Sequence, residues 1–525
     1  MIKTTNNRYR IFKYRLSRTS AKNDITTEKA VGWFILLLGV IFRLLLISDH
    51  YLSLDDLFTV TITAQTSFAD AWTKKIVVEP HPPLFNVVVY FWTRLFSDSV
   101  CSLRSLSALF YFIVLCFIYR DGRHILPQNA FILYFALTAF TPVSLRFFLE
   151  VRPYTFYYPA SMLAMLYFIA LVKQNDEYNR TDALKFVCWA LIAALSHYFG
   201  MALVFFQVFY LFLLLFMRKK LFFKKRNIFL TFPVIASLVW FAFHISQIKN
   251  NQIATTWIYP TGLKYCIGYL QLVFGAPLPR IATSNDPQSI STILQSPLEL
   301  VNVIAVCIPL LAVCLILIFK GKQLVVTSFV QENEEKKALL ASIYLAVVPF
   351  LVFFVIGKFI PIVNWKYMMG YTPAVWMFLA LLLGTAASLR PLSHFFLGTV
   401  LVSSFLYFPG LVAIPRTQIG DALQEAVVLS EELKVPLVLP DLIEYKYFID
   451  DNVEDAIHWH DIDKSYENLP HRFISVFGHC TPTTNLNNPS ACVGANKPVL
   501  RRYGVEKVWK FALAGIYQFE RKQEE

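Results

Sequence analysis

The chain contains few charged residues. Of its 525 residues only 16% are Asp, Glu, Lys or Arg, whereas soluble domains carry roughly 25%. It also has few glycines and cysteines, 18 and 8, which excludes collagen-like repeats and a small disulfide-rich scaffold. Apolar residues make up 56% and aromatic residues 16%, and the mean hydropathy is +0.51. This composition excludes disorder and predicts a polytopic α-helical membrane protein.

Apolar stretches long enough to cross a bilayer recur along the chain. A spanning helix needs about 20 apolar residues, and we find no internal repeat of fixed period. One shorter run, residues 82–96, contains Asn86 and Arg94 and is predicted to be a helix lying in the membrane interface. The eleven predicted spans are residues 30–48, 102–119, 127–145, 153–172, 182–197, 199–217, 228–247, 298–319, 339–356, 367–388 and 392–409.

The net charge of +13 is best explained by membrane topology. With the N-terminus inside, the predicted inner segments hold more than twice as many Lys and Arg as the outer loops, among them the basic run 218–226. This asymmetry follows the positive-inside rule and requires that residues 82–96 do not span. We therefore predict a cytoplasmic basic arm at 1–29, a multi-pass protein of the cytoplasmic membrane, and an outer C-terminus. Contact with anionic lipid explains the basic residues on the inner side, so we predict no binding to nucleic acid.

Three further segments lie outside the spans. Residues 49–101 form the first outer loop, and residues 248–297 form a second with few charges. Residues 415–525 are mixed polar, with helical spacing at Ala422–Ser430 and short apolar runs at 437–439 and 473–477, which predicts an outer α/β domain. The transmembrane module is predicted to extend over residues 30–410.

The cysteines fall into two groups. Six lie in or beside spans and are predicted to be small apolar fillers. Cys480 and Cys492 both fall in the predicted outer domain, where a disulfide could close a loop rich in Pro and Asn. No cysteine pair has the spacing of a zinc site.

Unusual polar residues collect on the predicted outer side. Asp55 and Asp56 follow the first span, His81 precedes the interfacial helix, and Glu150 and Arg152 follow the third span. Ionisable groups at membrane depth are functional candidates because leaving them there is costly. Each also has a simpler explanation: the two aspartates could cap a helix, His81 could pack in a turn, and Glu150 with Arg152 could form a local ion pair.

Taken in order, these motifs resemble those of the GT-C membrane glycosyltransferases. The resemblance is strongest to the protein O-mannosyltransferase type and its bacterial relatives, including the lipid A aminoarabinose and galacturonic acid transferases. It covers residues 30–220, and a weaker match to the family's motifs lies near Lys366, Tyr367 and Pro373. The turn 119–126 lacks the family's usual paired arginines, and residues 415–525 match no subfamily. The motifs are Asp55 and Asp56; His81, Pro82, Pro83 and Leu84; Leu103, Arg104, Ser107, Ala108 and Leu109; and Glu150, Arg152, Pro153 and Tyr154.

The resemblance implies that a sugar moves from a polyprenyl-phosphate donor to a lipid, glycan or protein acceptor, with Asp55 as base. Asp56 would orient Asp55 or raise its pKa by like-charge proximity. A departing phosphate needs cations rather than a general acid, and Arg152 is the stronger candidate because guanidinium binds phosphate bidentately. Direct displacement predicts inversion, and a divalent cation on the carboxylates stays an open alternative. The predicted substrate-binding residues are His81, Arg104, Glu150, Arg152, Tyr154, Lys366 and Tyr367.

Two other classes of protein fit a chain of this composition. A transporter or flippase of lipid-linked glycans would place charges near the midplane of broken, often repeated helices, whereas here the charges gather at one predicted surface. A non-catalytic scaffold whose outer domain binds a partner is the second alternative.

Overall fold

The computed structural model describes most of residues 29–439 and the strands that follow. Its gaps are residues 48–53, 175–177, 218–227, 249–260, 275–300, 321–332, 361–362, 386–389 and 414–417, together with isolated positions in 301–320. After residue 439 the described segments are 457–458, 471–478, 503–510 and 514–521. The predicted basic arm 1–29, except Lys29, and the predicted Cys480–Cys492 bridge lie outside the described residues.

The chain divides into two compact units. The first comprises residues 1–47, 76–88 and 104–413, and the second comprises residues 48–75, 89–103 and 414–525. Two of these boundaries fall within helices. One lies in α4 (Leu84–Leu95), after residue 88, and the other lies near the start of α5 (Val100–Ile125), after residue 103.

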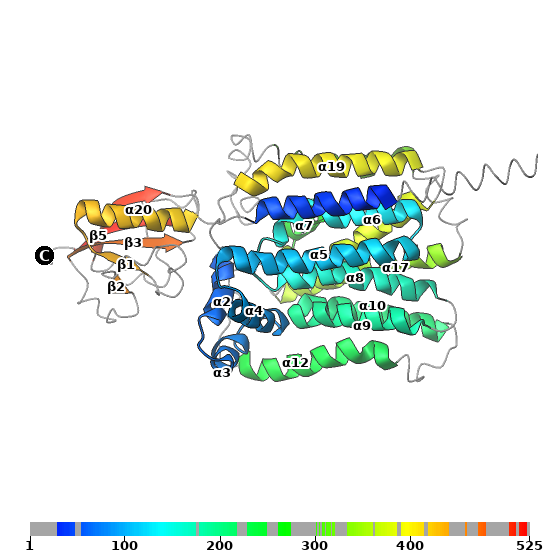
Figure 1. Cartoon of the computed structure of the whole chain (residues 1–525), viewed down its shortest axis with the longest axis horizontal. Helices are drawn as coiled ribbons and strands as arrows, with labels where there is room; N and C mark the ends of the chain where they lie inside the picture. The colour runs from blue at the N-terminus through cyan, green and yellow to red at the C-terminus, as the bar shows by residue number, and fades with distance from the viewer. Residues whose placement is uncertain are drawn as a thin grey trace, which may run out of the picture. The chain divides into compact units, whose positions relative to one another are not determined.

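The first unit is a bundle of helices that run alongside one another (Figure 1). Its described elements are the helix Lys29–Leu46, α5, α6 (Gln128–Phe140), α7 (Pro142–Phe147), α8 (Tyr154–Lys173), α9 (Arg180–Ser196), α10 (Tyr198–Met217), η2 (Phe229–Thr231), α12 (Phe232–Ile248), α13 (Leu263–Phe274), α17 (Asn333–Phe359), η3 (Trp365–Tyr371), α18 (Thr372–Gly384) and α19 (Arg390–Ala413).

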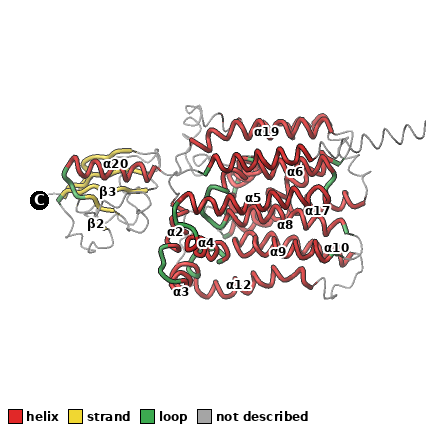
Figure 2. The backbone as a smooth tube through the Cα atoms, viewed as in Figure 1, coloured by secondary structure: helices red, strands yellow, loops and turns green. Residues whose placement is uncertain are grey.

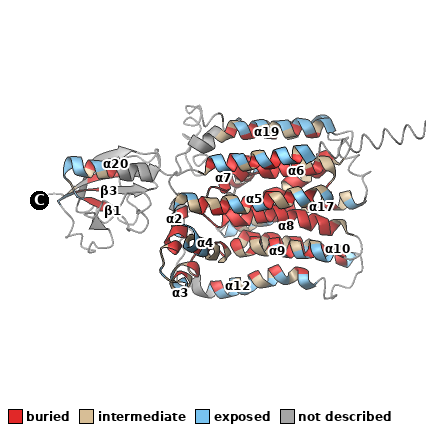
Figure 3. Ribbon diagram, in the orientation of Figure 1, coloured by how far each residue is buried: buried red, intermediate tan, exposed pale blue. Residues whose placement is uncertain are grey.

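Helix α8 forms the centre of this bundle. Apart from Thr155, Ser161 and the terminal Lys173, its side chains are apolar or aromatic, and residues Tyr154–Val172 are all buried, so the helix is red along most of its length in Figure 3. A helix without a polar face must be covered on every side, and α8 packs against α9, α10, α17, α18 and η3. The central helix thereby brings its first residue, Tyr154, next to the segments that carry the polar residues of the candidate site.

Large apolar side chains cover the perimeter of the bundle. Phe216 is 82% exposed and Phe359 is 81% exposed, which would be unfavourable in water but suits contact with lipid tails. Seven described helices are long and apolar enough to cross a membrane, and four shorter apolar helices accompany them, including α4 and α6. These features confirm the predicted polytopic α-helical membrane protein.

Three details differ from the sequence-based prediction. The predicted span 127–145 is two helices, α6 and α7, because Pro142 has no amide hydrogen to continue α6 and instead starts the next helix. The predicted turn 119–126 is mostly the end of α5, which continues to Ile125 just before Pro127. The predicted span 367–388 opens with the 3-10 helix η3 rather than with α-helix.

The second unit combines short helices with a sheet. Helix α2 (Leu54–Thr63), α3 (Phe68–Ala71) and the π-helix η1 (Trp72–Ile76) come from the first predicted outer loop. Residues beyond 414 supply α20 (Gln418–Leu433) and a five-stranded sheet of order β2-β1-β3-β5-β4, drawn yellow in Figure 2. The strands are β1 (Leu437–Leu439), β2 (Ile457–His458), β3 (Arg472–Gly478), β4 (Tyr503–Lys510) and β5 (Ala514–Arg521).

The sheet is mixed. β1 pairs in parallel with β2 and β3, whereas β5 pairs antiparallel with β3 and β4. Helix α20 covers β1, β3 and β5, and Ala426, Val438 and Ile474 are buried. The helix and the two apolar runs predicted in residues 415–525 thus correspond to α20, β1 and β3. The predicted domain boundaries stay a prediction.

Candidate active site

A buried ion pair joins two loops of the first unit. Glu79 lies just before α4 and Arg152 lies just before α8, and their Oε1 and Nη2 atoms are 2.8 Å apart. His81 Nδ1 lies 3.1 Å from the same carboxylate oxygen. The side chains of Glu79, His81 and Arg152 are all at least nine-tenths buried. The chain thus places a carboxylate, a histidine and a guanidinium together in a buried site.

The pKa of Glu79 reflects its partners. Burial alone would raise the pKa of this carboxyl, but the positive charge of Arg152 and the hydrogen bond with His81 outweigh burial and lower the pKa from 4.5 to about 2. Glu79 is therefore ionised at every pH above that value, and it balances the charge of Arg152.

The shifted pKa predicts a loss of stability in acid. Since the folded protein holds Glu79 at a lower pKa than the unfolded chain, its contribution is fully present above the unfolded pKa of 4.5 and is lost as pH falls towards 2. The shift corresponds to a contribution on the order of 3 kcal/mol. Thermal unfolding in detergent at pH 6, 4.5 and 3.5 measures this loss. The variant Glu79→Gln should lack this part of the pH dependence, and an identical pH profile in both proteins would contradict the assignment.

A second ion pair lies beside the first. Lys366 Nζ in η3 is 3.0 Å from Glu150 Oε2 and sits 4.5 Å from the centre of the Tyr154 ring. Tyr154 in turn packs edge-on against His81 at 6.0 Å and stacks with Tyr367 at 6.3 Å. The two ion pairs therefore belong to one connected group of side chains.

The ring of His197 lies in the middle of this group. It follows α9, in the turn to α10, and it is 3% exposed. Its centre is 5.0 Å from that of His81, 5.4 Å from Tyr154 and 5.2 Å from Tyr367. We call these eight residues the polar cluster: Glu79, His81, Glu150, Arg152, Tyr154, His197, Lys366 and Tyr367.

Two tyrosine hydroxyls fix η3 and so position Lys366 and Tyr367. Tyr157 in α8 donates to the Tyr367 carbonyl at 3.1 Å, and Tyr371 donates to the Phe199 carbonyl at 3.0 Å. Gly370 allows this approach, since a Cβ there would lie 2.3 Å from the Tyr157 ring. The 3-10 helix is thus held against both α8 and the start of α10.

The polar cluster suits an anionic ligand. Arg152 and Lys366 supply two cationic groups, each paired with a carboxylate, and α8 and α10 both begin at the cluster, with Tyr154 and Tyr198 as first residues. Helix N-termini carry partial positive charge and favour anions. Guanidinium and ammonium groups bind phosphate oxygens by charge-assisted hydrogen bonds. A phosphate group is a ligand that this arrangement can hold.

Six of the predicted substrate-binding residues come together in the polar cluster: His81, Glu150, Arg152, Tyr154, Lys366 and Tyr367. The local pair predicted as one explanation for Glu150 and Arg152 differs from the pairs described here, in which Arg152 binds Glu79 and Glu150 binds Lys366. Arg104 is fully buried in α5. The role of these residues in substrate binding stays a prediction.

Asp55 and Asp56 lie in the second unit. They are the second and third residues of α2, and Asp56 is 1% exposed, while the side chain of Asp55 lies outside the described part of the structure. A position in the first turn is compatible with the capping explanation. Their predicted catalytic role stays a prediction.

Sequence reasoning gave no role to Glu79 and His197. Glu79 lies beside the His-Pro-Pro motif, which marks it as a candidate. Its ion pair was not predictable, because its partner Arg152 lies far along the chain. His197 ends the predicted span 182–197, and a lone histidine at the end of an apolar stretch is usually a core residue. Only packing brings these two side chains to the cluster.

Among the described residues, no group of three or more His, Cys, Asp or Glu side chains could hold a metal ion. The divalent cation raised as an alternative therefore gains no support from this part of the chain. The six described cysteines form no disulfide: Cys101, Cys116, Cys188, Cys266, Cys307 and Cys314.

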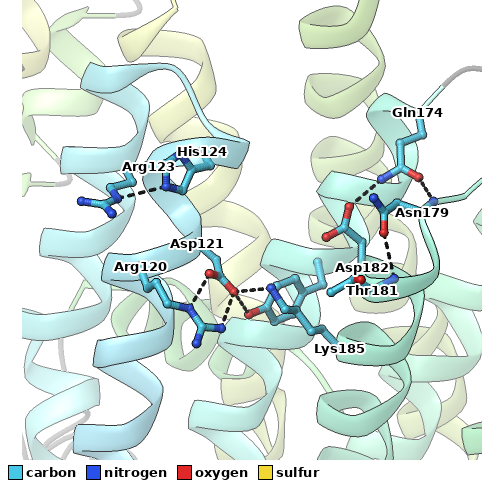
Figure 4. A network of polar contacts seen from close by, with 10 residues as sticks. Arg120, Asp121, Arg123, His124, Gln174, Asn179, Thr181, Asp182 and Lys185 are labelled. Carbon is cyan, nitrogen blue, oxygen red and sulfur yellow. Dashed lines mark hydrogen bonds and ion pairs between the residues drawn. The ribbon is translucent and has the colours of Figure 1, made fainter.

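A separate polar network lies towards the other end of α8 (Figure 4). Asp121 accepts hydrogen bonds from Arg120 at 2.7 Å, from Lys185 at 2.8 Å and from the Tyr167 hydroxyl at 2.5 Å. Nearby, Gln174 donates to Asp182 at 2.8 Å. Because its carboxylate has several donors from three helices, Asp121 ties α5, α8 and α9 together, which is a structural role.

Residues 80–246 match the sequence profile of a family described as dolichyl-phosphate-mannose-protein mannosyltransferase. The match includes His81, Glu150, Arg152, Tyr154 and His197, and it confirms the resemblance that the motifs predict. Fold and match together define a polytopic helical membrane protein that resembles, over these residues, the protein O-mannosyltransferase type of GT-C enzyme.

Solved structures similar to this chain include ArnT from Cupriavidus metallidurans in two states. The apo structure aligns with a TM-score of 0.42 at 12% identity, covering 93% of this chain and 98% of that one. The structure bound to undecaprenyl phosphate aligns with a TM-score of 0.43 at 14% identity and the same coverage. No curated protein shows significant similarity to this chain.

Proposed function

We propose that this chain is a membrane glycosyltransferase that transfers a sugar from a polyprenyl-phosphate donor to a lipid, glycan or protein acceptor. The observation that carries the proposal is the polar cluster, in which the buried pair Arg152–Glu79 and the partly buried pair Lys366–Glu150 place two cations and two carboxylates near the starts of α8 and α10. Most of the cluster falls within the residues that match the mannosyltransferase family. The proposed site is the outer face of the cytoplasmic membrane, with the N-terminus inside and residues 415–525 outside.

In this proposal the donor phosphate is the leaving group and the polar cluster stabilises it. The bond between the anomeric carbon and the phosphate oxygen breaks, and the acceptor oxygen forms the new bond from the opposite face, which inverts the configuration. Arg152 and Lys366 offset the charge that develops on the phosphate. Asp55 takes the proton of the acceptor hydroxyl, and Asp56 orients it. The buried surroundings of Arg152 strengthen its interaction with the phosphate.

Purified protein in lipid nanodiscs tests the proposal directly. With a radiolabelled polyprenyl-phosphate sugar and a membrane extract as source of acceptor, we expect release of polyprenyl phosphate and transfer of the label. Arg152→Ala should lower this transfer. Arg180→Ala is its matched control, because it also removes an arginine, but from an exposed position at the start of α9 outside the polar cluster. Folded wild-type protein that leaves every tested donor intact would overturn the proposal. Movement of the intact lipid-linked sugar across a bilayer would instead identify a flippase.

A further inference from the structure

One ring nitrogen of His197 accepts a hydrogen bond, and the other has no partner within the part of the chain that the structure describes. Phe199 N donates a hydrogen bond to His197 Nδ1 at 3.1 Å, so Nδ1 carries a lone pair and not a proton. The neutral ring then bears its proton on Nε2. Nε2 is buried and has no hydrogen-bond partner among the described residues. An unpartnered buried donor is costly and uncommon in native structures, which points to a ligand as its partner.

The ring cannot turn easily to find another partner. It stacks on Tyr157 with ring centres 5.0 Å apart and an angle of 16° between planes. Tyr154, Tyr367 and Phe199 lie at 5.4, 5.2 and 5.8 Å. Gly200 permits the turn that carries His197, because a Cβ there would lie 2.1 Å from the Ala193 carbonyl oxygen. The backbone and four aromatic rings thus hold the imidazole in one orientation.

The surroundings of His197 favour a negatively charged partner. Arg152, Lys366 and His81 all act electrostatically on its ring. The carboxylates of this cluster already face Arg152 and Lys366, through the pairs Glu79–Arg152 and Glu150–Lys366. A neutral N–H donor beside two cations adds a directed hydrogen bond to an anionic oxygen without adding charge.

We infer that His197 is a further donor-binding residue, whose Nε2–H donates a hydrogen bond to a phosphate oxygen of the polyprenyl-phosphate donor. The inference rests on the proposed function and deepens it by adding a third phosphate contact to Arg152 and Lys366. In this role His197 stays neutral and transfers no proton.

Binding of undecaprenyl phosphate, compared with binding of the uncharged polyprenol of the same length, isolates the phosphate contact. Wild-type protein should bind the phosphate more tightly than the polyprenol. In His197→Phe, which keeps an aromatic ring but has no donor, we expect phosphate affinity to fall by about 10- to 100-fold and polyprenol affinity to stay unchanged. His197→Gln, whose amide N–H can reach the Nε2 position, should recover most of the phosphate affinity.

A melting temperature for each variant checks folding. Unchanged phosphate affinity in His197→Phe would overturn the inference, and so would an equal loss for both lipids in both variants, because that pattern marks a packing role. If the wild-type protein itself shows no preference for the phosphate, the proposed function fails, and this inference fails with it. The wild-type measurement therefore separates the two failures.

Discussion

Arg152→Ala is expected to destabilise the protein by about 3–5 kcal/mol and to lower transfer by roughly 100- to 1,000-fold. The loss of stability arises because Glu79 is 8% exposed in its side chain and Arg152 is its ion-pair partner. Removing the guanidinium leaves a buried carboxylate without its ion-pair partner, with His81 still beside it. The loss of transfer arises because the same guanidinium is proposed to bind the donor phosphate. Thermal unfolding in detergent and the nanodisc transfer assay measure the two effects.

A double variant separates stability from function. Combining Arg152→Met with Glu79→Gln removes both charges and keeps similar side-chain volume, and replacing a buried pair in this way is often neutral. We expect the double variant to recover much of the lost stability but not the transfer activity. Arg180→Ala, at an exposed position, should change stability by less than about 0.5 kcal/mol. A double variant that regains full transfer would exclude Arg152 from phosphate binding.

Asp55→Asn is expected to reduce transfer by about 10²- to 10⁴-fold, the range for loss of a general base, without lowering expression. Asparagine has nearly the same shape as aspartate but cannot accept the proton of the acceptor hydroxyl. Turnover measured with a purified polyprenyl-phosphate sugar tests this, and the affinity for undecaprenyl phosphate should be unaffected by the change.

Asp56→Asn is the matched comparison for Asp55. Asp56 is 1% exposed in α2, so its replacement should lower stability as well as turnover, whereas the loss in Asp55→Asn should fall on turnover alone. If the two acids only cap α2, asparagine should replace either of them with little effect, because it is itself a good residue at helix starts. Full activity in Asp55→Asn would therefore favour the capping explanation.

The sequence indicated the candidate site through residues that are close together in the chain. His81 stands out beside two prolines, and Glu150, Arg152 and Tyr154 form one short motif. Their partners were not predictable, because ion pairs between distant segments leave no local pattern. Glu150 pairs with Lys366 from η3, and Arg152 pairs with Glu79 from the loop before α4. The resemblance to a family supplied the order of the motifs but not these contacts.

The helices were predictable because hydrophobic length alone determines whether a segment can cross a bilayer. The predicted span 153–172 differs from α8 by a single residue at each end, since a chain in lipid must satisfy its backbone hydrogen bonds within each helix. Helix ends were less predictable. Pro142 split one predicted span, and the chain continued as helix to Ile125 where a turn was predicted.

The sequence by itself thus determined the membrane class, the positions of most helices and the motif residues His81, Arg152 and Tyr154, because hydrophobicity and short motifs are local properties. Only the tertiary structure decided which charges are paired and that His197 lies among them. The physical reason is that α8, buried on every side, brings the starts of two helices and of η3 to one place. Whether a buried polar group is paired depends on that arrangement and not on its neighbours in sequence.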